Sequence, residues 1–243
     1  MPLDFDRIYA TDLSYVDNCW KLCGDGHCCT FDRYKAKFRL IGTPPAQQLP
    51  LLPGEYQWLS DKGHLPAFKK HERRATTHEF KGRRIQMETM VGKEPGCLCT
   101  NAFRTTICRL YPVLPCFDVD GTLVGADMEF GSFEMLEELQ GLPRVCRIET
   151  IPLNQLERLL AITREISRDP VALFYVSAYR LSKQHARARL VELGSGMAQP
   201  NFFSLYEMAL IRKQLVDLPS LDSALGELAG RFENHYGTAF SLE

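Results

Sequence analysis

The chain has 243 residues, of which 45% are apolar and 24% are charged, and its formal net charge at pH 7 is −1. These values are ordinary for a soluble globular protein and give no general attraction to nucleic acid or to a membrane surface. No apolar run approaches the roughly 18 residues that span a bilayer, and the opening residues, MPLDFDRIYATD, lack the basic and apolar blocks of a secretory signal. We therefore expect a cytoplasmic protein without a membrane partner.

Cysteine is the unusual feature of the composition. The chain contains nine cysteines, and eight of them fall in two short clusters. The cytoplasm keeps ordinary thiols reduced, and a chain of this length can bury a core without disulfides, so metal binding or redox chemistry is the expected use of such clusters. The ninth cysteine, Cys146, stands alone and is expected to be a small buried side chain.

The first cluster, NCWKLCGDGHCC, contains Cys19, Cys23, Cys28 and Cys29. On a helix, Cys19 and Cys23 would share one face, and the two glycines that follow would allow a sharp return of the chain toward it. Because adjacent residues point in different directions, Cys28 and Cys29 are not expected to bind one ion in the same way. Either they serve neighbouring metals, or one is a ligand and the other supports the site.

The second cluster, GCLCTNAFRTTICRLYPVLPC, contains Cys97, Cys99, Cys108 and Cys116. Residues two apart on an extended chain point the same way, so Cys97 and Cys99 could bind one ion together. Four thiolates suit zinc and an iron–sulfur cluster equally well. The spacing of the cysteines therefore leaves the identity of the metal open.

The two clusters together resemble a family of cysteine-rich proteins described as zinc- or iron-chelating. The family pattern is a C-x(n)-C-x(n)-CC cluster followed by further cysteines and a C-R-x-[FY]-P step, here Cys108, Arg109, Tyr111 and Pro112. The same broad grouping includes the flagellin lysine N-methylase. The resemblance implies metal binding by Cys19, Cys23, Cys28, Cys29 and Cys108, with Cys97 or Cys99 as the intermediate cysteine. Together with the clustering of the thiols, this gives eight candidate metal ligands: Cys19, Cys23, Cys28, Cys29, Cys97, Cys99, Cys108 and Cys116.

Between and after the clusters, the chain up to residue 150 predicts short strands. TFDRYKAKFRLIG (30–42) alternates like a strand, and a Pro-rich connector leads to one short helix after Pro53 and Gly54. The stretch 68–84 carries seven basic residues and two acids. It predicts a strand or hairpin edge, or else a binding patch (69–84) for an anionic or protein partner. Nucleic acid is not indicated.

The segment CFDVDGTLVG contains the Asp-x-Asp-Gly-Thr motif of haloacid-dehalogenase-type phosphatases, in which Asp118 would be the nucleophile and Asp120 the acid/base. That chemistry requires a central buried parallel strand before Asp118, but prolines 112 and 115 interrupt this segment. The alternative is a hairpin turn at Asp120 and Gly121, with no catalytic role. The turn is the favoured interpretation.

From residue 152 the periodicity predicts four helices and no strand. Asn154 is the expected cap of the first helix, and Asp169-Pro170 is its expected stop. The second helix is expected to end at Gly194. The sequence around that end, RLVELGSGMA, is similar to the glycine-rich loop of S-adenosylmethionine-dependent methyltransferases, but too few residues follow for such a domain.

We therefore expect an α+β protein. A cysteine-rich metal-binding part with short antiparallel strands (1–150) would pack on a helical unit (151–243) as one globular body. The predicted function is to hold zinc or an iron–sulfur cluster. An iron–sulfur-dependent oxidoreductase or protein-modifying enzyme is the alternative, and a phosphatase is the weaker one. The residues specify no reaction.

Overall fold

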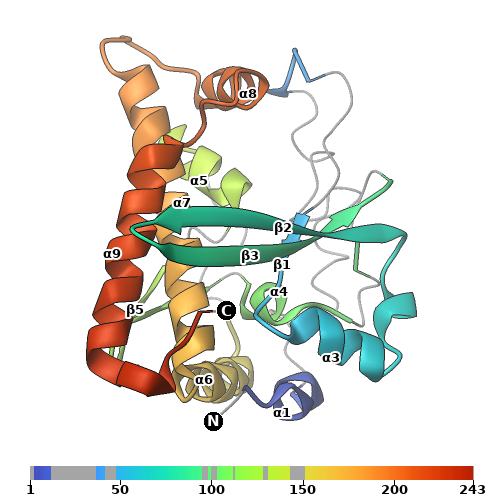
Figure 1. The fold of residues 1–243 in the computed structure, drawn as a ribbon. Helices are drawn as coiled ribbons and strands as arrows, with labels where there is room; N and C mark the ends of the chain where they lie inside the picture. The colour runs from blue at the N-terminus through green and yellow to red at the C-terminus, as the bar shows by residue number, and fades with distance from the viewer. Residues whose placement is uncertain are drawn as a thin grey trace.

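The structure is a computed structural model, and it describes residues 3–11, 37–41, 48–94, 98–99, 103–111, 113–127, 131–142 and 151–242. The fold is α+β, as predicted, with small antiparallel sheets and a helical C-terminal part (Figure 1). Within the described ranges, no helix combines the length and apolar character needed to cross a bilayer.

The N-terminal part contains short helices and all of the named strands. Its helices are α1 (Phe5–Ala10), α3 (Glu55–Asp61), η2 (Leu65–Ala67), α4 (Thr106–Leu110) and α5 (Ser132–Leu139). Its strands are β1 (Gln48–Pro50), β2 (His71–Phe80), β3 (Arg83–Gly92), β4 (Leu114–Phe117) and β5 (Leu123–Asp127). The C-terminal part contains α6 (Leu153–Ser167), α7 (Pro170–Gly194), α8 (Phe202–Ile211), α9 (Leu218–Tyr236) and η4 (Gly237–Ala239).

The larger sheet is antiparallel with the strand order β1-β3-β2. Lys81 and Gly82 form the two-residue turn between β2 and β3, and both have positive φ, at 49° and 78°. Positive φ at both positions is the geometry of a type I′ turn, which matches the twist of paired strands. The basic segment thus contains an edge strand, β2. A strand at a sheet edge was one of the two predictions for this segment.

The two faces of this sheet contact different clusters of apolar side chains. Ile85 and Met87 of β3 belong to the largest cluster, which also contains residues of α4, α6, α7 and α9. Leu49 and Met90, which pair across β1 and β3, belong to a smaller cluster with Phe68 and neighbouring residues. Because successive side chains on a strand alternate between faces, β3 contributes to both clusters.

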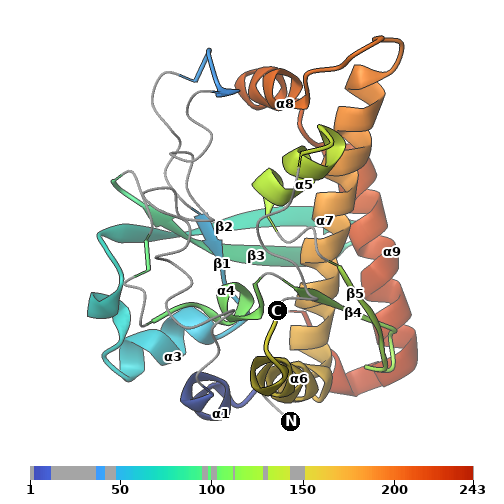
Figure 2. The same ribbon diagram turned by 180° about the vertical axis from the view of Figure 1, so that it is seen from behind.

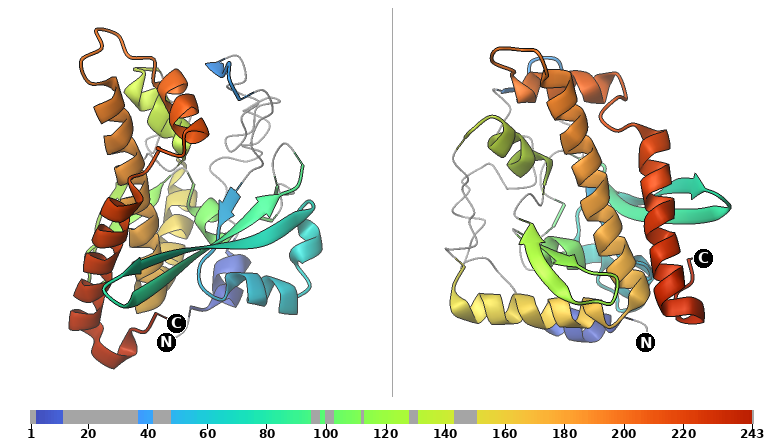
Figure 3. Two further views of the ribbon diagram at one scale, coloured as in Figure 1. Left: turned by 45° about the horizontal axis from the view of Figure 1, so that its top comes forward. Right: turned by 90° about the vertical axis from the view of Figure 1, so that its left-hand side faces the viewer.

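The long helix α7 belongs to the C-terminal part and also contacts the N-terminal part. The carboxylate of Asp169 caps α7 by accepting hydrogen bonds from the N–H groups of Val171 and Ala172, and Pro170 occupies its first position. Figure 2 and Figure 3 show α7 and α9 side by side and antiparallel, with the larger sheet crossing them. The Tyr179 hydroxyl of α7 lies 3.0 Å from the carbonyl oxygen of Leu51, beside the sheet.

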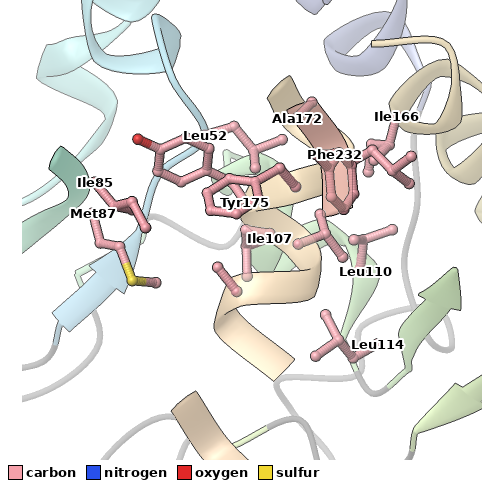
Figure 4. Packing of buried hydrophobic residues seen from close by; sticks show 14 of the residues in the cluster. Leu52, Ile85, Met87, Ile107, Leu110, Leu114, Ile166, Ala172, Tyr175 and Phe232 are labelled. Carbon is pink, nitrogen blue, oxygen red and sulfur yellow. The ribbon is translucent and has the colours of Figure 1, made fainter. Parts of the chain in front are cut away.

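The main core lies where the sheet, α4 and α7 meet. Figure 4 shows Ile85 and Met87 of β3 facing Tyr175 of α7, with Ile107 and Leu110 of α4 nearby. Residues from both the first 150 positions and the last 93 therefore bury apolar surface against one another, the dominant favourable contribution to folding.

The predicted helices of the C-terminal part are present, including the end of α7 at Gly194, and so is the short helix predicted after Gly54 in the N-terminal part. Two local predictions are wrong. Asn154 lies inside the first turn of α6, whose cap position is Pro152. Residues 37–41, the described portion of the predicted strand 30–42, are not in a strand, and the N–H groups of residues 39–41 donate to a side chain instead of a neighbouring strand.

Candidate metal centre

Three of the eight predicted metal ligands lie in the described part of the chain: Cys99, Cys108 and Cys116. All three are free thiols. The remaining predicted ligands, Cys19, Cys23, Cys28, Cys29 and Cys97, fall outside the described residues, as does Cys146. The geometry of the site can therefore be built from the second cluster and from the residues that flank the first.

Cys99 and Cys108 border the same apolar cluster. Cys99 forms an isolated antiparallel bridge with Phe68, and the N–H of Lys69 donates to the carbonyl oxygen of Leu98 at 3.0 Å. Cys99 is buried in the smaller apolar cluster, while Cys108, on α4, packs partly buried against it. Two of the predicted ligands thus face a common, poorly hydrated region.

Cys116 lies in a different environment, on β4 against α7. Its Sγ is 3.8 Å from the carbonyl oxygen of Leu114, and its charged neighbours are Arg180 and Asp127. Burial raises the pKa of the Cys116 thiol, which the positive charge of Arg180 offsets only in part. Among the residues described, no three Cys, His, Asp or Glu side chains form a group that could hold a metal ion. A complete ligand set would therefore include residues outside the described ranges.

Glu55, a residue that the sequence analysis did not identify, fixes the position of α4. Its carboxylate is fully buried and accepts hydrogen bonds from the Tyr9 hydroxyl at 2.6 Å, the Leu52 N–H at 2.9 Å and the Thr106 N–H at 2.5 Å. The last bond caps the helix that carries Cys108. We call these four residues the Glu55 network, and it connects α1, α3 and α4.

Burial of this carboxylate has an electrostatic cost. Loss of hydration raises the pKa of Glu55, while the hydrogen bonds from Tyr9 and from backbone N–H groups lower it in part. A buried carboxylate with three donors satisfies most of its acceptor sites. No sequence signal marks Glu55, because a glutamate early in a short helix is usually exposed.

Arg109 connects the second cluster to the residues that precede the first. Its Nε donates to the carbonyl oxygen of Arg104 at 3.0 Å, and its Nη1 donates to the carbonyl oxygen of Thr11 at 2.9 Å. The guanidinium also stacks on the rings of Tyr9, at 4.5 Å, and Phe103, at 5.8 Å. Thr11 is the last described residue before the first cysteine cluster, so a residue eight positions before Cys19 contacts the helix that carries Cys108.

Tyr111, the tyrosine of the C-R-x-Y-P step, donates a hydrogen bond to a buried carboxylate, as Tyr9 does. Its hydroxyl donates to the buried carboxylate of Glu134 on α5 at 2.6 Å. Burial raises the pKa of Glu134, and the hydrogen bond from Tyr111 and the charge of Lys183 lower it in part. The residues on either side of Cys108 are thus hydrogen-bonded to buried carboxylates: Thr106, before it, donates to Glu55, and Tyr111, after it, donates to Glu134.

The first described residues after the first cluster pack on α8. Phe38 lies among the rings of Phe133, Phe203 and Tyr206, with its ring centre 5.8 Å from that of Phe203. The N–H groups of residues 39–41 donate to the buried carboxylate of Glu207. Burial alone would raise the pKa of Glu207, but these donors lower it below the usual value. Figure 1 shows α1 and α8 at opposite ends of the molecule.

The Asp-x-Asp-Gly-Thr motif forms a hairpin turn, as the favoured interpretation predicted. β4 and β5 pair antiparallel on either side of it, and the N–H of Asp118 donates to the carbonyl oxygen of Thr122 at 2.9 Å. Asp118 and Asp120 are exposed. The motif therefore lacks the buried parallel strand that the phosphatase alternative requires.

The basic segment 69–84 carries less free charge than its composition suggests. Arg73 and Arg74 pair with Glu88 and Glu72. Arg83 makes a two-pronged contact with Glu233 of α9, with Nη2 to Oε2 at 2.7 Å. These contacts neutralise part of the surface that was predicted to attract an anionic partner.

Comparison with protein-family models, with curated proteins and with solved structures finds no match to this chain.

Proposed function

We propose that this protein binds zinc or an iron–sulfur cluster through thiolates of both cysteine clusters. The hydrogen bond from Arg109 to Thr11 is the observation that supports this proposal most directly. It joins Thr11, which lies eight positions before Cys19 in the sequence, to the helix that carries Cys108. Two segments about one hundred positions apart along the sequence can supply ligands to one site only if they meet in space.

The surroundings of Cys108 also suit a metal site. A five-residue helix is too short to be stable alone, yet α4 is capped by Glu55 and packs on β1. Cys99 is held nearby by its bridge to Phe68. Thiols fixed in a poorly hydrated region lose little entropy when they bind an ion, and residues that orient ligands contribute strongly to metal affinity.

The identity of the bound metal would determine the class of function. Zinc bound by four thiolates would make this a structural metal protein, because such a closed site leaves no position for a substrate. An iron–sulfur cluster would extend the proposal to an oxidoreductase or a protein-modifying enzyme. Eight thiolates could form two four-coordinate sites, or one site with further sulfur beside it.

Elemental analysis of protein purified without oxygen tests the proposal. We expect zinc, or iron with sulfide, in a fixed ratio to the chain, and a brown colour with absorption near about 400 nm if the metal is an iron–sulfur cluster. Cys108→Ser should lower the metal ratio, and Cys146→Ser, outside both clusters, should leave it unchanged. A metal-free protein, or an unchanged ratio in Cys108→Ser, would contradict the proposal.

A further inference from the structure

A cavity of about 230 Å³ lies between the β4–β5 hairpin, α7 and α9. Figure 3 shows the hairpin against α7, with α9 running alongside α7. The Asp-x-Asp-Gly-Thr turn, which has no role in the proposed metal centre, lies at its edge, since Asp118 is 3.8 Å from Arg231 of the cavity wall. This cavity is separate from the Glu55 network and from Cys99 and Cys108.

The cavity wall combines apolar surface with positive charge. Phe117 and Val119 of the hairpin face Leu181 of α7 and Leu228 of α9, while Arg180 and Arg231 supply two guanidinium groups. Among the described residues that line the cavity, none is acidic. A wall of this composition fits a ligand with an apolar body and one negatively charged group.

The arginines retain donors for such a ligand. Arg180 is 3.7 Å from Asp127 and Arg231 is 3.8 Å from Asp118, both longer than the roughly 2.7–2.9 Å of a charge-assisted hydrogen bond. The Nε of Arg180 is buried and has no hydrogen-bond partner within the described part of the chain, while the Arg180 side chain contacts the Cys116 thiol, a weak acceptor. A buried guanidinium nitrogen with only a weak acceptor is costly, and a bound anion would reduce that cost.

The volume limits the size of the ligand. A dry cavity of about 150 Å³ can hold a single benzene ring, whereas drug-sized ligands occupy about 300–1,000 Å³. A volume of about 230 Å³ therefore suits one ring or a short branched chain with a small charged group. The planar fork of arginine matches the two oxygens of a carboxylate.

We propose that this cavity binds a small organic carboxylate with a monoaryl or short branched apolar body. The carboxylate contacts Arg180 and Arg231, and the apolar body contacts Phe117, Leu181 and Leu228. Asp118 competes with the ligand for Arg231, so the turn that resembles a phosphatase motif limits the affinity of the site.

Calorimetric titration of the full chain with benzoate tests the proposal, with benzyl alcohol as a neutral ligand of similar shape. Benzoate should bind, and Arg231→Gln should weaken it about tenfold or more, because a hydrogen bond to a charged group is lost. Asp118→Asn should strengthen binding about two- to fivefold, since it removes a competing surface ion pair. Arg212→Gln, an exposed arginine on another face, should have no effect.

The opposite signs at Asp118 and Arg231 separate binding from a general loss of structure. Leu228→Trp should fill the cavity and abolish benzoate binding while the melting temperature confirms that the chain is folded. Binding of benzoate no tighter than that of benzyl alcohol, or unaffected by Arg231→Gln, would overturn the proposal. Tighter binding of phenyl phosphate or inorganic phosphate would overturn the assignment to carboxylates.

Discussion

Replacing Arg109 by lysine keeps the positive charge but removes the geometry of this side chain. Arg109 donates to two carbonyl oxygens through different nitrogens, Nε to Arg104 and Nη1 to Thr11, and its guanidinium carbon lies over the ring of Tyr9 at 4.5 Å from the ring centre. A lysine ammonium is a compact donor at the end of a flexible chain. It can reach one of these carbonyl groups but not both, and it cannot stack.

The cost of Arg109→Lys follows from these contacts. One lost hydrogen bond from a charged group costs about 1.5–3 kcal/mol, and the lost stacking adds about 0.5–1 kcal/mol. The free energy of unfolding should therefore fall by about 2–4 kcal/mol. For a chain of this length, each kcal/mol lowers the melting temperature by about 2–4 °C, so we expect a decrease of roughly 5–15 °C.

The assay measures the melting temperature and the metal content of the same preparation. Because Thr11 is the last described residue before the first cysteine cluster, eight positions before Cys19, loss of its contact with Arg109 should also lower the metal ratio, and excess metal should partly restore the melting temperature. Arg212→Lys, an exposed arginine on the surface, is the matched control and should change neither quantity.

Two outcomes of this experiment would refute the reasoning. An unchanged melting temperature would mean that the two hydrogen bonds contribute nothing to stability. A lowered melting temperature with an unchanged metal ratio would mean that the contact between Arg109 and Thr11 is structural only. The second result would remove the main support for ligands shared between the clusters.

Three further substitutions test the burial of Glu55 and the packing of α9. Burial raises the pKa of Glu55, so its ionisation opposes folding increasingly as pH rises above about 4.3, the pKa in the unfolded chain. The difference in unfolding free energy between the wild-type chain and Glu55→Gln, measured by urea unfolding, should therefore shrink as pH rises above that value. A difference that stays constant would contradict a buried carboxylate that ionises. A Cβ at Gly226 would lie 2.1 Å from the ring of Phe80, whereas one at Gly230 of the same helix would meet its nearest atom at 3.5 Å. Gly226→Ala should cost about 1–3 kcal/mol, and Gly230→Ala should stabilise, so equal melting temperatures would refute this packing.

The elements that the sequence predicted are those whose signal is local. The helical periodicity of α7 and α9, the stop after α6 at Asp169-Pro170 and the end of α7 at Gly194 depend on residues a few positions apart. The exposed basic strand β2 was predictable because lysine and arginine suit sheet edges. The hairpin at Asp120 and Gly121 was also favoured on a local signal, because turn residues act through the conformation of their own backbone.

The elements that were missed depend on contacts between residues distant in sequence. Glu55 accepts a hydrogen bond from Thr106, and Glu207 from residues 39–41, and neither glutamate differs in its local sequence from an exposed one. In residues 37–41, the described portion of the expected strand 30–42, no strand forms, and the Glu207 carboxylate accepts hydrogen bonds from the N–H groups of residues 39–41. Alternation of apolar residues reports which side of a chain is buried, but not which partner its backbone finds.

The contacts around Cys108 lead to a prediction for removal of the metal. The N–H of Thr106, the guanidinium of Arg109 and the hydroxyl of Tyr111 all find their acceptors without any thiolate. The largest apolar cluster, which includes residues of α7 and α9, contains no cysteine among its described members. In a classical zinc finger the metal supplies the folding energy, but here packing and buried hydrogen bonds supply it for the described part of the chain. A chelator should therefore lower the melting temperature while the far-ultraviolet circular dichroism keeps its helical signal. A chelator that abolishes the helical signal would mean that the metal, and not these contacts, folds α4 and the helices that pack near it.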